Sequence, residues 1–233
     1  MISIIIPTYN EAGNIGNLLK QINYYLKKIN HEIIIVDDNS PDKTWEIAAN
    51  IARKNKNIQV IRRINERGLT SAFNYGIGLS RGQVIGWLDA DLSHPPRLLR
   101  VMLKQLQKYD VVIASRYVDG GSDQRKEYFA VWFSKIINKM SQILLFNDIT
   151  DYTSGYILVK KTWIKNYRLK GDYGEYFIDL IFNLKKNGAK IKEIGYINYS
   201  RIHGTSKTAI NIFDFFRRGI KYIATVFSLC LKK

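Results

Sequence analysis

The sequence predicts an α/β protein with a Rossmann-like, mostly parallel sheet flanked by helices, followed by a C-terminal amphipathic helix. Short runs of β-branched residues alternate with segments whose apolar residues recur at helical spacing, which is typical of a parallel sheet. The early runs end in polar residues, and the carboxyl ends of parallel strands meet at one edge of a sheet. The 233 residues, 46% of them hydrophobic, are enough for one domain with a substantial core. We assign residues 1–208 to this domain and 209–233 to the helix.

Strand-length apolar runs predict the strands, and clusters of Gly, Pro or polar residues mark their ends. The predicted strands are residues 2–6, 33–36, 58–61, 84–88, 111–114, 157–159 and 191–199. Pro7 is expected to end the first strand, because proline has no N–H for the ladder of a sheet. Residues 118–126 are rich in Gly, Asp and Ser, and we expect them to form a mobile flap.

Apolar residues at helical spacing predict helices between and after these strands. The predicted helices are residues 15–26, 45–52, 69–79, 98–106, 129–146, 176–186 and 210–231. Asn10 or Asn14 is expected to cap the first helix, and Gly82 to close the third.

The last predicted helix has two distinct faces. Its apolar face carries Ile210, Phe213, Phe216, Ile220, Ile223 and Phe227. Another side carries the cations Arg217, Arg218 and Lys221. Such a helix can lie in a membrane interface, with its aromatic residues among headgroups and its cations beside anionic lipid. An equally compatible interpretation is that the apolar face packs on the domain itself.

Charge and cysteine content restrict the class of protein. A net charge of +16 and a pI of about 9.8 indicate an anionic partner, such as nucleic acid, a phosphorylated ligand or an acidic membrane. Cys230 is the one cysteine, which excludes an internal disulfide and a Cys-based zinc cluster. No apolar run approaches the ~20 residues that span a bilayer, although a spanning segment after Lys233 would be compatible with this pattern. Because Met1 opens no signal sequence, we expect a cytoplasmic protein.

The most informative stretch is 87–96, in which an apolar strand runs directly into Asp89 and Asp91 and a double proline follows. Two carboxylates at the carboxyl end of a strand suit a hard divalent cation that itself holds a phosphate. We therefore predict that Asp89 and Asp91 bind a metal ion and, through it, a diphosphate. The simpler alternative is that they only cap the helix that begins near Pro95.

Motifs in a fixed order extend over nearly the whole chain. They are Pro7-Thr8-Tyr9-Asn10-Glu11, Val36-Asp37-Asp38-Asn39-Ser40-Pro41-Asp42, Arg67-Gly68-Leu69-Thr70-Ser71-Ala72, Asp89-Ala90-Asp91-Leu92-Ser93-His94-Pro95, Ser115-Arg116-Tyr117, Thr153-Ser154-Gly155 and Arg201-x-x-Gly204-x-Ser206-Lys207. Each motif is weak alone. Together they resemble the family 2 glycosyltransferases of GT-A fold, and within these the dolichol-phosphate mannose synthase group.

The resemblance implies a site for a nucleotide sugar. The residues that match nucleotide-sugar positions are Pro7, Tyr9, Glu11, Val36, Asp37, Asp38, Gly68, Asp89, Ala90 and Asp91. Among these, Asp89 and Asp91 match an Asp-x-Asp pair that bridges the diphosphate through Mg²⁺ or Mn²⁺. A carboxylate can accept hydrogen bonds from guanine N–H groups or ribose hydroxyls. For Glu11 and Asp37, ordinary helix capping is the alternative.

The resemblance also implies groups that bind phosphate, namely Arg116, Arg125, Arg201, Ser206 and Lys207. Arg116 and Arg201 would act in catalysis together with the two aspartates. Arginine binds phosphate oxygens bidentately, although outside such a context arginines are more commonly solvated surface charges.

The chain departs from the family pattern at three places. Ser93 stands where some relatives have Gln, a weaker candidate metal ligand. Relatives often carry basic residues shortly before the serine that matches Ser134, and here Arg125 and Lys126 are expected to substitute. Asp179 stands where the family has Glu.

The implied reaction transfers a hexose from a nucleotide diphosphate sugar to a polyprenyl or dolichyl monophosphate, with inversion at the anomeric carbon. The expected sugar is mannose, and the expected donor is GDP-mannose. The lipid phosphate is already anionic near neutral pH, with a second ionisation at about pH 6, so no general base is required. We expect the protein to bind peripherally to the cytoplasmic face of a membrane. A membrane-anchoring subunit is a further expected partner.

Other functions are compatible with parts of the pattern. A UDP-glucose-dependent polyprenyl-phosphate glucosyltransferase, or a transferase with a saccharide or protein acceptor, would have the same fold. Charge alone suggests nucleic-acid binding, but the aromatic residues lie in apolar helices and no known nucleic-acid motif occurs, so we expect no nucleic-acid partner. A scaffold that binds nucleotide sugar without turnover would be recognised by its inactivity.

Overall fold

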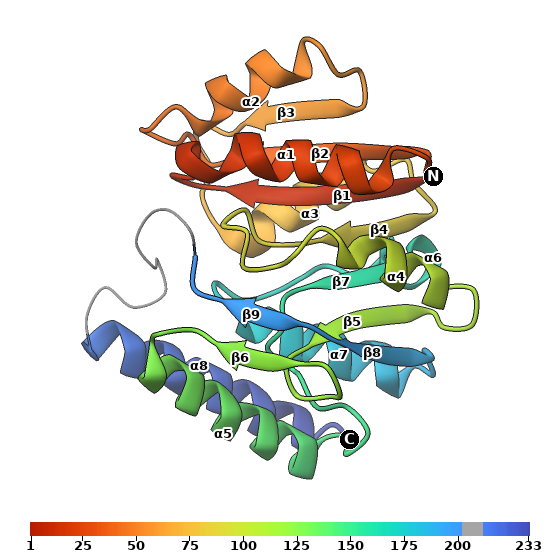
Figure 1. Ribbon diagram of the computed structural model, residues 1–233. Coiled ribbons are helices and arrows are strands. Elements are labelled where there is room, and N and C mark those ends of the chain that lie inside the picture. Colours follow the sequence, from red (N-terminus) through yellow and green to blue (C-terminus); the bar gives the residue numbers. More distant parts are fainter. Residues whose placement is uncertain (202–211) are drawn as a thin grey trace.

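Residues 1–201 and 212–233 are described by a computed structural model, in which a seven-stranded sheet of order β3-β2-β1-β4-β7-β5-β8 forms the centre (Figure 1). The strands are β1 (Ile2–Thr8), β2 (His31–Asp37), β3 (Ile58–Arg62), β4 (Val84–Trp87), β5 (Val111–Ser115), β7 (Ile157–Lys160) and β8 (Ile191–Gly195). Neighbouring strands are parallel except at β7, which is antiparallel to β4 and β5. The predicted mostly parallel sheet is therefore confirmed.

The reversed direction of β7 matters for the site. Because β7 starts at the edge where β4 and β5 end, the residues just before it lie beside their carboxyl ends. Arg116, directly after β5, accordingly donates a hydrogen bond from Nη2 to Oγ1 of Thr153 over 2.7 Å. The alternation of strands and helices in the sequence predicts parallel strands, so it did not predict the reversal of β7. In this reversed strand the polar residues at the shared edge precede the strand, whereas in β4 and β5 they follow it.

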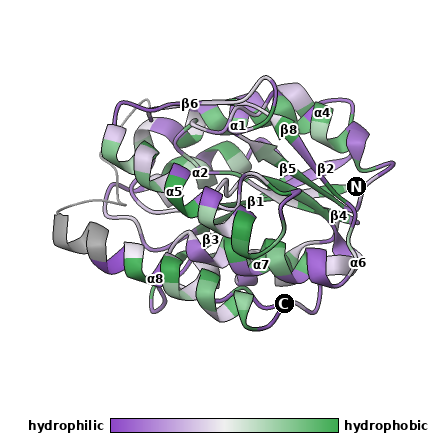
Figure 2. Ribbon diagram, turned by 90° about the horizontal axis from the view of Figure 1, so that it is seen from below, coloured by the Kyte–Doolittle hydropathy of each residue, from purple (hydrophilic) through white to green (hydrophobic). Residues whose placement is uncertain are grey.

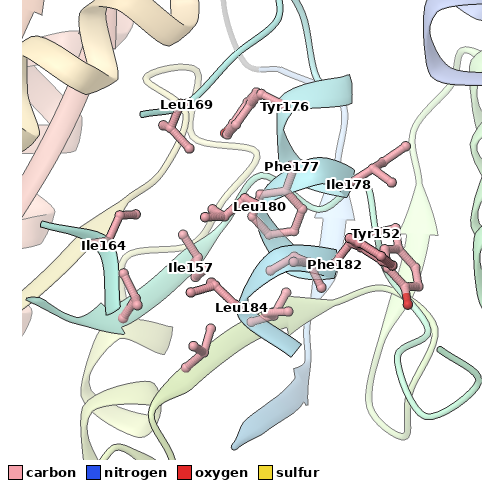
Figure 3. Close-up of a cluster of buried hydrophobic side chains, with 14 of the residues drawn as sticks. Tyr152, Ile157, Ile164, Leu169, Tyr176, Phe177, Ile178, Leu180, Phe182 and Leu184 are labelled. Atoms are coloured by element: carbon pink, nitrogen blue, oxygen red, sulfur yellow. The ribbon is translucent and has the colours of Figure 1, made fainter. Parts of the chain in front are cut away.

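Helices pack against both faces of the sheet (Figure 1). They are α1 (Ala12–Leu26), α2 (Thr44–Ala52), α3 (Leu69–Leu79), α4 (Leu98–Gln105), α5 (Tyr128–Leu144), α6 (Lys161–Ile164), α7 (Glu175–Lys186) and α8 (Ile212–Cys230). Successive strand side chains point to opposite faces, so Ile4 joins the core beneath α1 and α4 while Ile5 joins the core beneath α3 and α7. Figure 3 shows α7 directing Phe177 and Leu180 toward Ile157 of β7.

Two expectations about element ends were wrong. Pro7 lies within β1 rather than after it, which is tolerated because β1 pairs with β4 only as far as Ile5. Gly82 does not close α3, which ends at Leu79. Its N–H instead donates to Oγ of Ser3 over 2.8 Å, and a Cβ at Gly82 would lie 2.7 Å from the Ser3 backbone nitrogen. Glycine is therefore required here by close packing of two chain segments.

The predicted asparagine cap of α1 is also absent. The helix starts after Glu11, and no side chain caps it. Asn10 has left-handed backbone geometry with φ of 55°, which asparagine tolerates. Asn14 lies inside the helix and donates from Nδ2 to the Glu11 carboxylate over 2.8 Å.

The predicted flap, 118–126, contains a strand instead of only loop. Strand β6 (Ser122–Gln124) pairs in parallel with β9 (Ile197–Tyr199) in a separate two-stranded sheet. The single strand expected at 191–199 is therefore divided into β8 and β9. The division at Tyr196 carries the chain from the main sheet to the small one.

Helix α8 combines both interpretations of the last predicted helix. Tyr222, Val226 and Leu229 pack on the core, whereas the predicted apolar face remains solvent-exposed at Ile220, Ile223 and Phe227. Ile210 and the side chains of Phe213 and Phe216 lie outside the described part of the chain. Among the described residues, no helix has both the length and the apolar character needed to cross a membrane.

Candidate active site

The loop after β4 places the acidic pair at the carboxyl edge of the sheet. The Asp89 side chain is 52% exposed, whereas that of Asp91 is 13% exposed. Leu92, which follows Asp91 in this loop, has a left-handed backbone with φ of 66°, an uncommon geometry for leucine that tightens the loop. Buried His94 accepts a hydrogen bond at Nδ1 from the Asp89 N–H over 3.0 Å and stacks on Tyr156. His94 thus shapes the loop.

The two carboxylates have different electrostatic environments. Burial alone would raise the pKa of Asp91, but hydrogen bonds from Ser93 and the positive charge of Arg201 lower it overall. Arg201 donates from Nη2 to Asp91 Oδ2 over 2.8 Å, and the same nitrogen lies 3.8 Å from Glu11. The pKa of Asp89 is raised, first because the surrounding protein partly removes the carboxylate from water, and further because Asp91 and Glu11 carry negative charge nearby. The loop therefore concentrates negative charge that a cation would relieve.

Donor chemistry at this loop fits a divalent cation shared with a ligand. In residues 1–201 and 212–233, no cluster of three or more His, Cys, Asp or Glu side chains is arranged to hold a metal ion. Magnesium-like ions are commonly bound by one or two carboxylates together with substrate phosphates and water. Asp89 and Asp91 match that donor set, because they can supply two oxygen ligands and leave the others to a diphosphate.

The loop after β1 and the turn before α3 form the next part of the edge. The Arg67 guanidinium lies 3.7 Å from the centre of the Tyr9 ring, a cation–π contact. Pro7 pairs with Val36 in the sheet, so these two predicted residues set the backbone from which Tyr9 projects. Glu11 is buried and contacts Arg201, which links this loop to the acidic pair.

Asp37 and Asp38 were predicted to contact the nucleotide, and both are engaged within the protein. Asp37 is fully buried and accepts hydrogen bonds from Thr8 and Ser40. It therefore joins the loops after β1 and β2.

Asp38 binds buried Arg63 through Oδ1 and the N–H of Gly68 through Oδ2. Gly68, with φ of 148°, precedes α3 and lies in this network. Ala90, between Asp89 and Asp91 in the sequence, is buried. Direct contact of Asp37, Asp38, Gly68 and Ala90 with a nucleotide remains a prediction.

Beside the acidic loop, a network of buried charges surrounds Arg116. Its guanidinium donates from Nε and Nη2 to Asp151 over 2.8 and 2.6 Å, and from Nη1 to Asp123 over 3.2 Å. Arg125 also binds Asp123 bidentately, over 2.8 and 2.7 Å. The Asp151 and Asp123 side chains are 0% and 1% exposed, so this network fixes both arginines.

A cavity of about 120 Å³ opens next to this network. It is lined by Arg116, Arg125, Ala130, Phe133, Ser134, Ile137, Thr153, Arg218, Gly219 and Tyr222. Two of the predicted phosphate-binding residues, Arg116 and Arg125, thus meet at one cavity together with Ser134. Arg218 was expected on a lipid-facing side of its helix and lies in this wall instead.

Tyr196 contacts the acidic loop through its ring, and its backbone N–H donates to the carbonyl oxygen of Ser115, the residue before Arg116, over 3.0 Å. It packs on His94 and Tyr156 from the loop side, with ring centres 5.7 and 6.2 Å away. Burial raises the pKa of the Tyr196 hydroxyl; the positive charge of Arg116 lowers this pKa and the negative charge of Asp89 raises it. Tyr196 therefore connects the acidic loop with the end of β5 that precedes Arg116.

Other predicted residues have different positions. Ser206 and Lys207 lie outside the described residues. Ser93 donates its backbone N–H to Asp91 over 3.0 Å, so it supports that carboxylate. Asp179 binds the Tyr167 hydroxyl and Asn183 on α7.

Sequence reasoning missed the buried partners Arg63, Asp123 and Asp151, and it did not place Arg218 at the cavity. Asp123 was part of a presumed flap, and Asp151 appeared to be loop. The available signal was the position of Asp151 just before Thr153-Ser154-Gly155. Its pairing with Arg116 depends on the reversed strand β7.

Fold and site together define a class of α/β protein that offers paired carboxylates and clustered arginines at one sheet edge, suited to phosphorylated ligands. The chain belongs to glycosyl transferase family 2, whose family model matches residues 3–168. The predicted family and GT-A fold are thereby confirmed.

Two named relatives are similar over most of the chain. A dolichol-phosphate mannosyltransferase of Pyrococcus furiosus is 34% identical over 220 residues, covering 93% of this chain and 62% of the relative. A polyprenol monophosphomannose synthase of Mycolicibacterium smegmatis is 32% identical, covering 88% of this chain and 79% of the relative. The chain thus spans less than two thirds of the Pyrococcus protein.

Among solved structures, glucosyl-3-phosphoglycerate synthase of Mycobacterium tuberculosis, in complex with Mn²⁺, UDP and glucosyl-3-phosphoglycerate, has a TM-score of 0.73. The match covers 99% of this chain and 80% of that chain at 16% identity. This similarity shows a shared fold.

Proposed function

We propose that this protein transfers mannose from GDP-mannose to a polyprenyl or dolichyl monophosphate. The observation that carries the proposal is that two sites lie at the same edge of the sheet: an acidic loop after β4 suited to a metal-bound diphosphate, and an arginine-lined cavity of phosphate size that includes Arg116 at the end of β5. The names of the two relatives support mannose and a lipid phosphate as the substrates.

In the proposed reaction, an oxygen of the lipid phosphate attacks the anomeric carbon as the bond to the diphosphate breaks, and GDP leaves. Because a phosphate monoester is already anionic above about pH 6, no side chain has to remove a proton. The protein's contribution is to hold acceptor and donor in line and to stabilise the charge of the departing diphosphate.

Named residues divide this work. Asp89 and Asp91 would hold Mg²⁺ or Mn²⁺, and the ion would supply Lewis-acid neutralisation of the diphosphate charge. Arg201, which lies on Asp91, is in a position to shift toward a phosphate oxygen when a cation takes over that carboxylate. Arg116 and Arg125, held by Asp123 and Asp151, would face the acceptor phosphate.

A lipid substrate also fits the outer surface of α5 and α8, which lie side by side (Figure 1). Figure 2 shows hydrophobic and hydrophilic residues interspersed along both helices. Large apolar side chains exposed on these helices include Phe129, Trp132, Ile136, Ile220, Ile223 and Phe227. We propose that this surface, termed the α5/α8 face, contacts a membrane peripherally.

A donor and acceptor panel tests the function. Purified protein is incubated with Mg²⁺ or Mn²⁺, polyprenyl phosphate and either GDP-mannose or UDP-glucose, and lipid-linked sugar is measured. We expect mannosyl lipid from GDP-mannose, and none after chelation of the metal. Transfer from UDP-glucose alone would overturn the mannose assignment, and donor hydrolysis without lipid product would overturn the acceptor assignment.

A further inference from the structure

Each backbone N–H of segment 150–153, which lies between α5 and β7, is bound by a side-chain oxygen. Glu193 of β8 accepts hydrogen bonds from the N–H groups of Thr150 and Asp151 over 2.8 and 2.9 Å. The N–H groups of the next two residues donate to Asn138 of α5 over 2.6 Å and to the Asp151 carboxylate over 3.2 Å. The segment lies outside the helices and strands, so side chains rather than a ladder of backbone hydrogen bonds hold its conformation.

Asp151 connects this segment to the arginine-lined cavity. Its buried carboxylate accepts hydrogen bonds from Arg116 over 2.9 Å at the backbone N–H, 2.8 Å at Nε and 2.6 Å at Nη2. Nη2 also donates to Oγ1 of Thr153 over 2.7 Å. Because a guanidinium is planar and rigid, these contacts fix the direction in which Nη1 points.

One N–H of the Arg116 guanidinium has no acceptor within residues 1–201 and 212–233. Four of the five donate, namely Nε–H, both hydrogens of Nη2, and one hydrogen of Nη1, which donates to Asp123 over 3.2 Å. The fifth is on Nη1, and Arg116 lines the cavity. A hydrogen bond weakens steeply when its angle falls below about 120°, so a phosphate oxygen in the cavity can use this N–H only while Asp151 holds the guanidinium in place.

A second contact joins Glu193 to the residue before Arg116. Thr150 donates its hydroxyl to the Glu193 carboxylate over 3.0 Å, and Oγ of buried Ser115 lies 3.1 Å from Thr150 Oγ1. Ser115 ends β5, whose Ile113 pairs with Glu193 in the sheet. Glu193 therefore supports both the segment that binds the guanidinium and the end of the strand that carries Arg116.

We propose that Glu193 is a positioning residue for the acceptor phosphate, because it holds Asp151 where Arg116 directs its remaining Nη1 hydrogen to the ligand. The inference rests on the proposed function and adds a residue that does not itself line the cavity. It follows that a change of one buried carboxylate on the edge strand β8 should weaken acceptor binding and leave donor binding unchanged.

The test compares Glu193→Gln with the matched control Glu32→Gln in the full-length protein. Glutamine keeps the size of the side chain, but its NH₂ group is a donor and cannot accept an N–H. Glu32 is a buried carboxylate of similar chemistry, which accepts the Ser3 hydroxyl over 2.6 Å and the Arg81 N–H over 2.7 Å. It lies near the start of β2, at the opposite edge of the sheet from Arg116.

A short, water-soluble acceptor, geranyl phosphate, keeps membrane binding out of the measurement. Steady-state rates give KM for geranyl phosphate at saturating GDP-mannose, and KM for GDP-mannose at saturating geranyl phosphate. Calorimetry gives Kd for geranyl phosphate without turnover, and urea unfolding gives the stability of each variant. Hydrogen exchange of segment 150–153 reports whether its backbone has loosened.

We expect Glu193→Gln to raise KM and Kd for geranyl phosphate about tenfold, which is the size of a lost hydrogen bond to a charged group. Exchange in segment 150–153 should become faster, and KM for GDP-mannose should stay unchanged. Glu32→Gln should lose stability and keep wild-type KM for both substrates. An unchanged Kd for geranyl phosphate in Glu193→Gln, or equal changes in Glu193→Gln and Glu32→Gln, would overturn the inference.

A milder variant guards against misfolding of Glu193→Gln. Thr150→Val keeps both N–H bonds to Glu193 but removes the hydroxyl that joins Glu193 to Ser115. We expect a smaller rise in KM for geranyl phosphate, about threefold, with an unchanged KM for GDP-mannose. An unchanged KM for geranyl phosphate would contradict the role of this support. If wild-type protein makes no mannosyl lipid, the proposed function itself fails, whereas an active wild type with an unaffected Glu193→Gln defeats only this inference.

Discussion

Arg201 donates a hydrogen bond from Nη2 to Oδ2 of Asp91 over 2.8 Å, joining residues that are 110 positions apart in the chain. The contact brings the end of β9 to the loop after β4, and it places a cation on one of the two carboxylates predicted to bind metal. The pair therefore couples two events: a metal ion that binds Asp91 competes with Arg201, and the released guanidinium becomes available to a phosphate.

This coupling predicts opposite effects of Arg201→Gln on two measurements. Mn²⁺ binding without nucleotide should tighten, because Asp91 loses a competing positive charge. Mannosyl transfer should fall about ten- to a hundredfold, because a hydrogen bond to a charged group contributes roughly 1.5–3 kcal/mol. Electron paramagnetic resonance titration and a transfer assay measure the two. Arg81→Gln, which alters an exposed arginine paired with Glu32, is the control, and parallel losses of metal binding and transfer would contradict the competition.

Asp123→Asn tests the buried network beside the cavity. Removing one charge from a buried ion pair costs about 3 kcal/mol, so urea unfolding at neutral pH should show a clear loss of stability. Asp172→Asn, which alters an exposed pair with Lys221, should change the free energy of unfolding by less than about 0.5 kcal/mol.

The stability provided by Asp123 should also depend on pH. Burial alone would raise its pKa, but hydrogen bonding to Arg125 and the charges of Arg125 and Arg116 hold the pKa below the ordinary value of 3.8. A depressed folded-state pKa means that the stabilisation is complete above pH 3.8 and is lost as the pH falls toward the folded-state value. The difference between wild type and Asp123→Asn should shrink over that acidic range. A constant difference would show that the effect is packing rather than charge.

Membrane contact through the α5/α8 face predicts a result for the double variant Ile220→Gln, Phe227→Gln. Both side chains are more than half exposed, at 65% and 54%, so their loss should leave the fold intact. Transfer of one such side chain out of water is worth about 1.5–3 kcal/mol, and sedimentation with anionic vesicles should fall at least about tenfold. Tyr24→Gln, which alters a 64% exposed residue of α1, is the control. Unchanged sedimentation of the double variant would reject this face and favour an anchoring subunit.

Point substitutions are preferable to deletion of the helix. Val226 and Leu229 of α8 are buried in the core, so deletion of residues 210–233 would uncover the core as well as remove the side chains proposed to contact lipid. Loss of vesicle binding after such a deletion would therefore have two explanations.

Local patterns were sufficient to predict the sheet and its edge. Apolar runs that end at Asp37 and before Asp89 placed carboxylates correctly, because parallel strands share an edge. Helix α3 was predicted from about Leu69 to Leu79 and has those bounds in the structure, since its apolar spacing is regular and Gly68 precedes it.

Pairings over long sequence distances could not be predicted. Asp151 lies 35 residues after Arg116, and nothing in its neighbours indicates a buried ion pair. The direction of β7 is set by a long connection through α5 that has no strand periodicity. Arg218 looked like one of several cations on an amphipathic helix, and its position in the cavity wall depends on the packing of α8 against α5, which the local sequence does not reveal.

The most direct test of the account is mannosyl transfer from GDP-mannose to polyprenyl phosphate by Asp91→Ala, with circular dichroism to verify folding. Loss of partners that merely surround a metal ligand costs roughly 10- to 100-fold, so loss of a ligand itself should reduce transfer by more than about 100-fold. Asp148→Ala, which alters an exposed aspartate, should retain wild-type activity. We predict an inactive, folded Asp91→Ala protein that no longer binds GDP in a Mn²⁺-dependent manner. A folded Asp91→Ala protein with full metal-dependent transfer would contradict the assignment of the acidic loop.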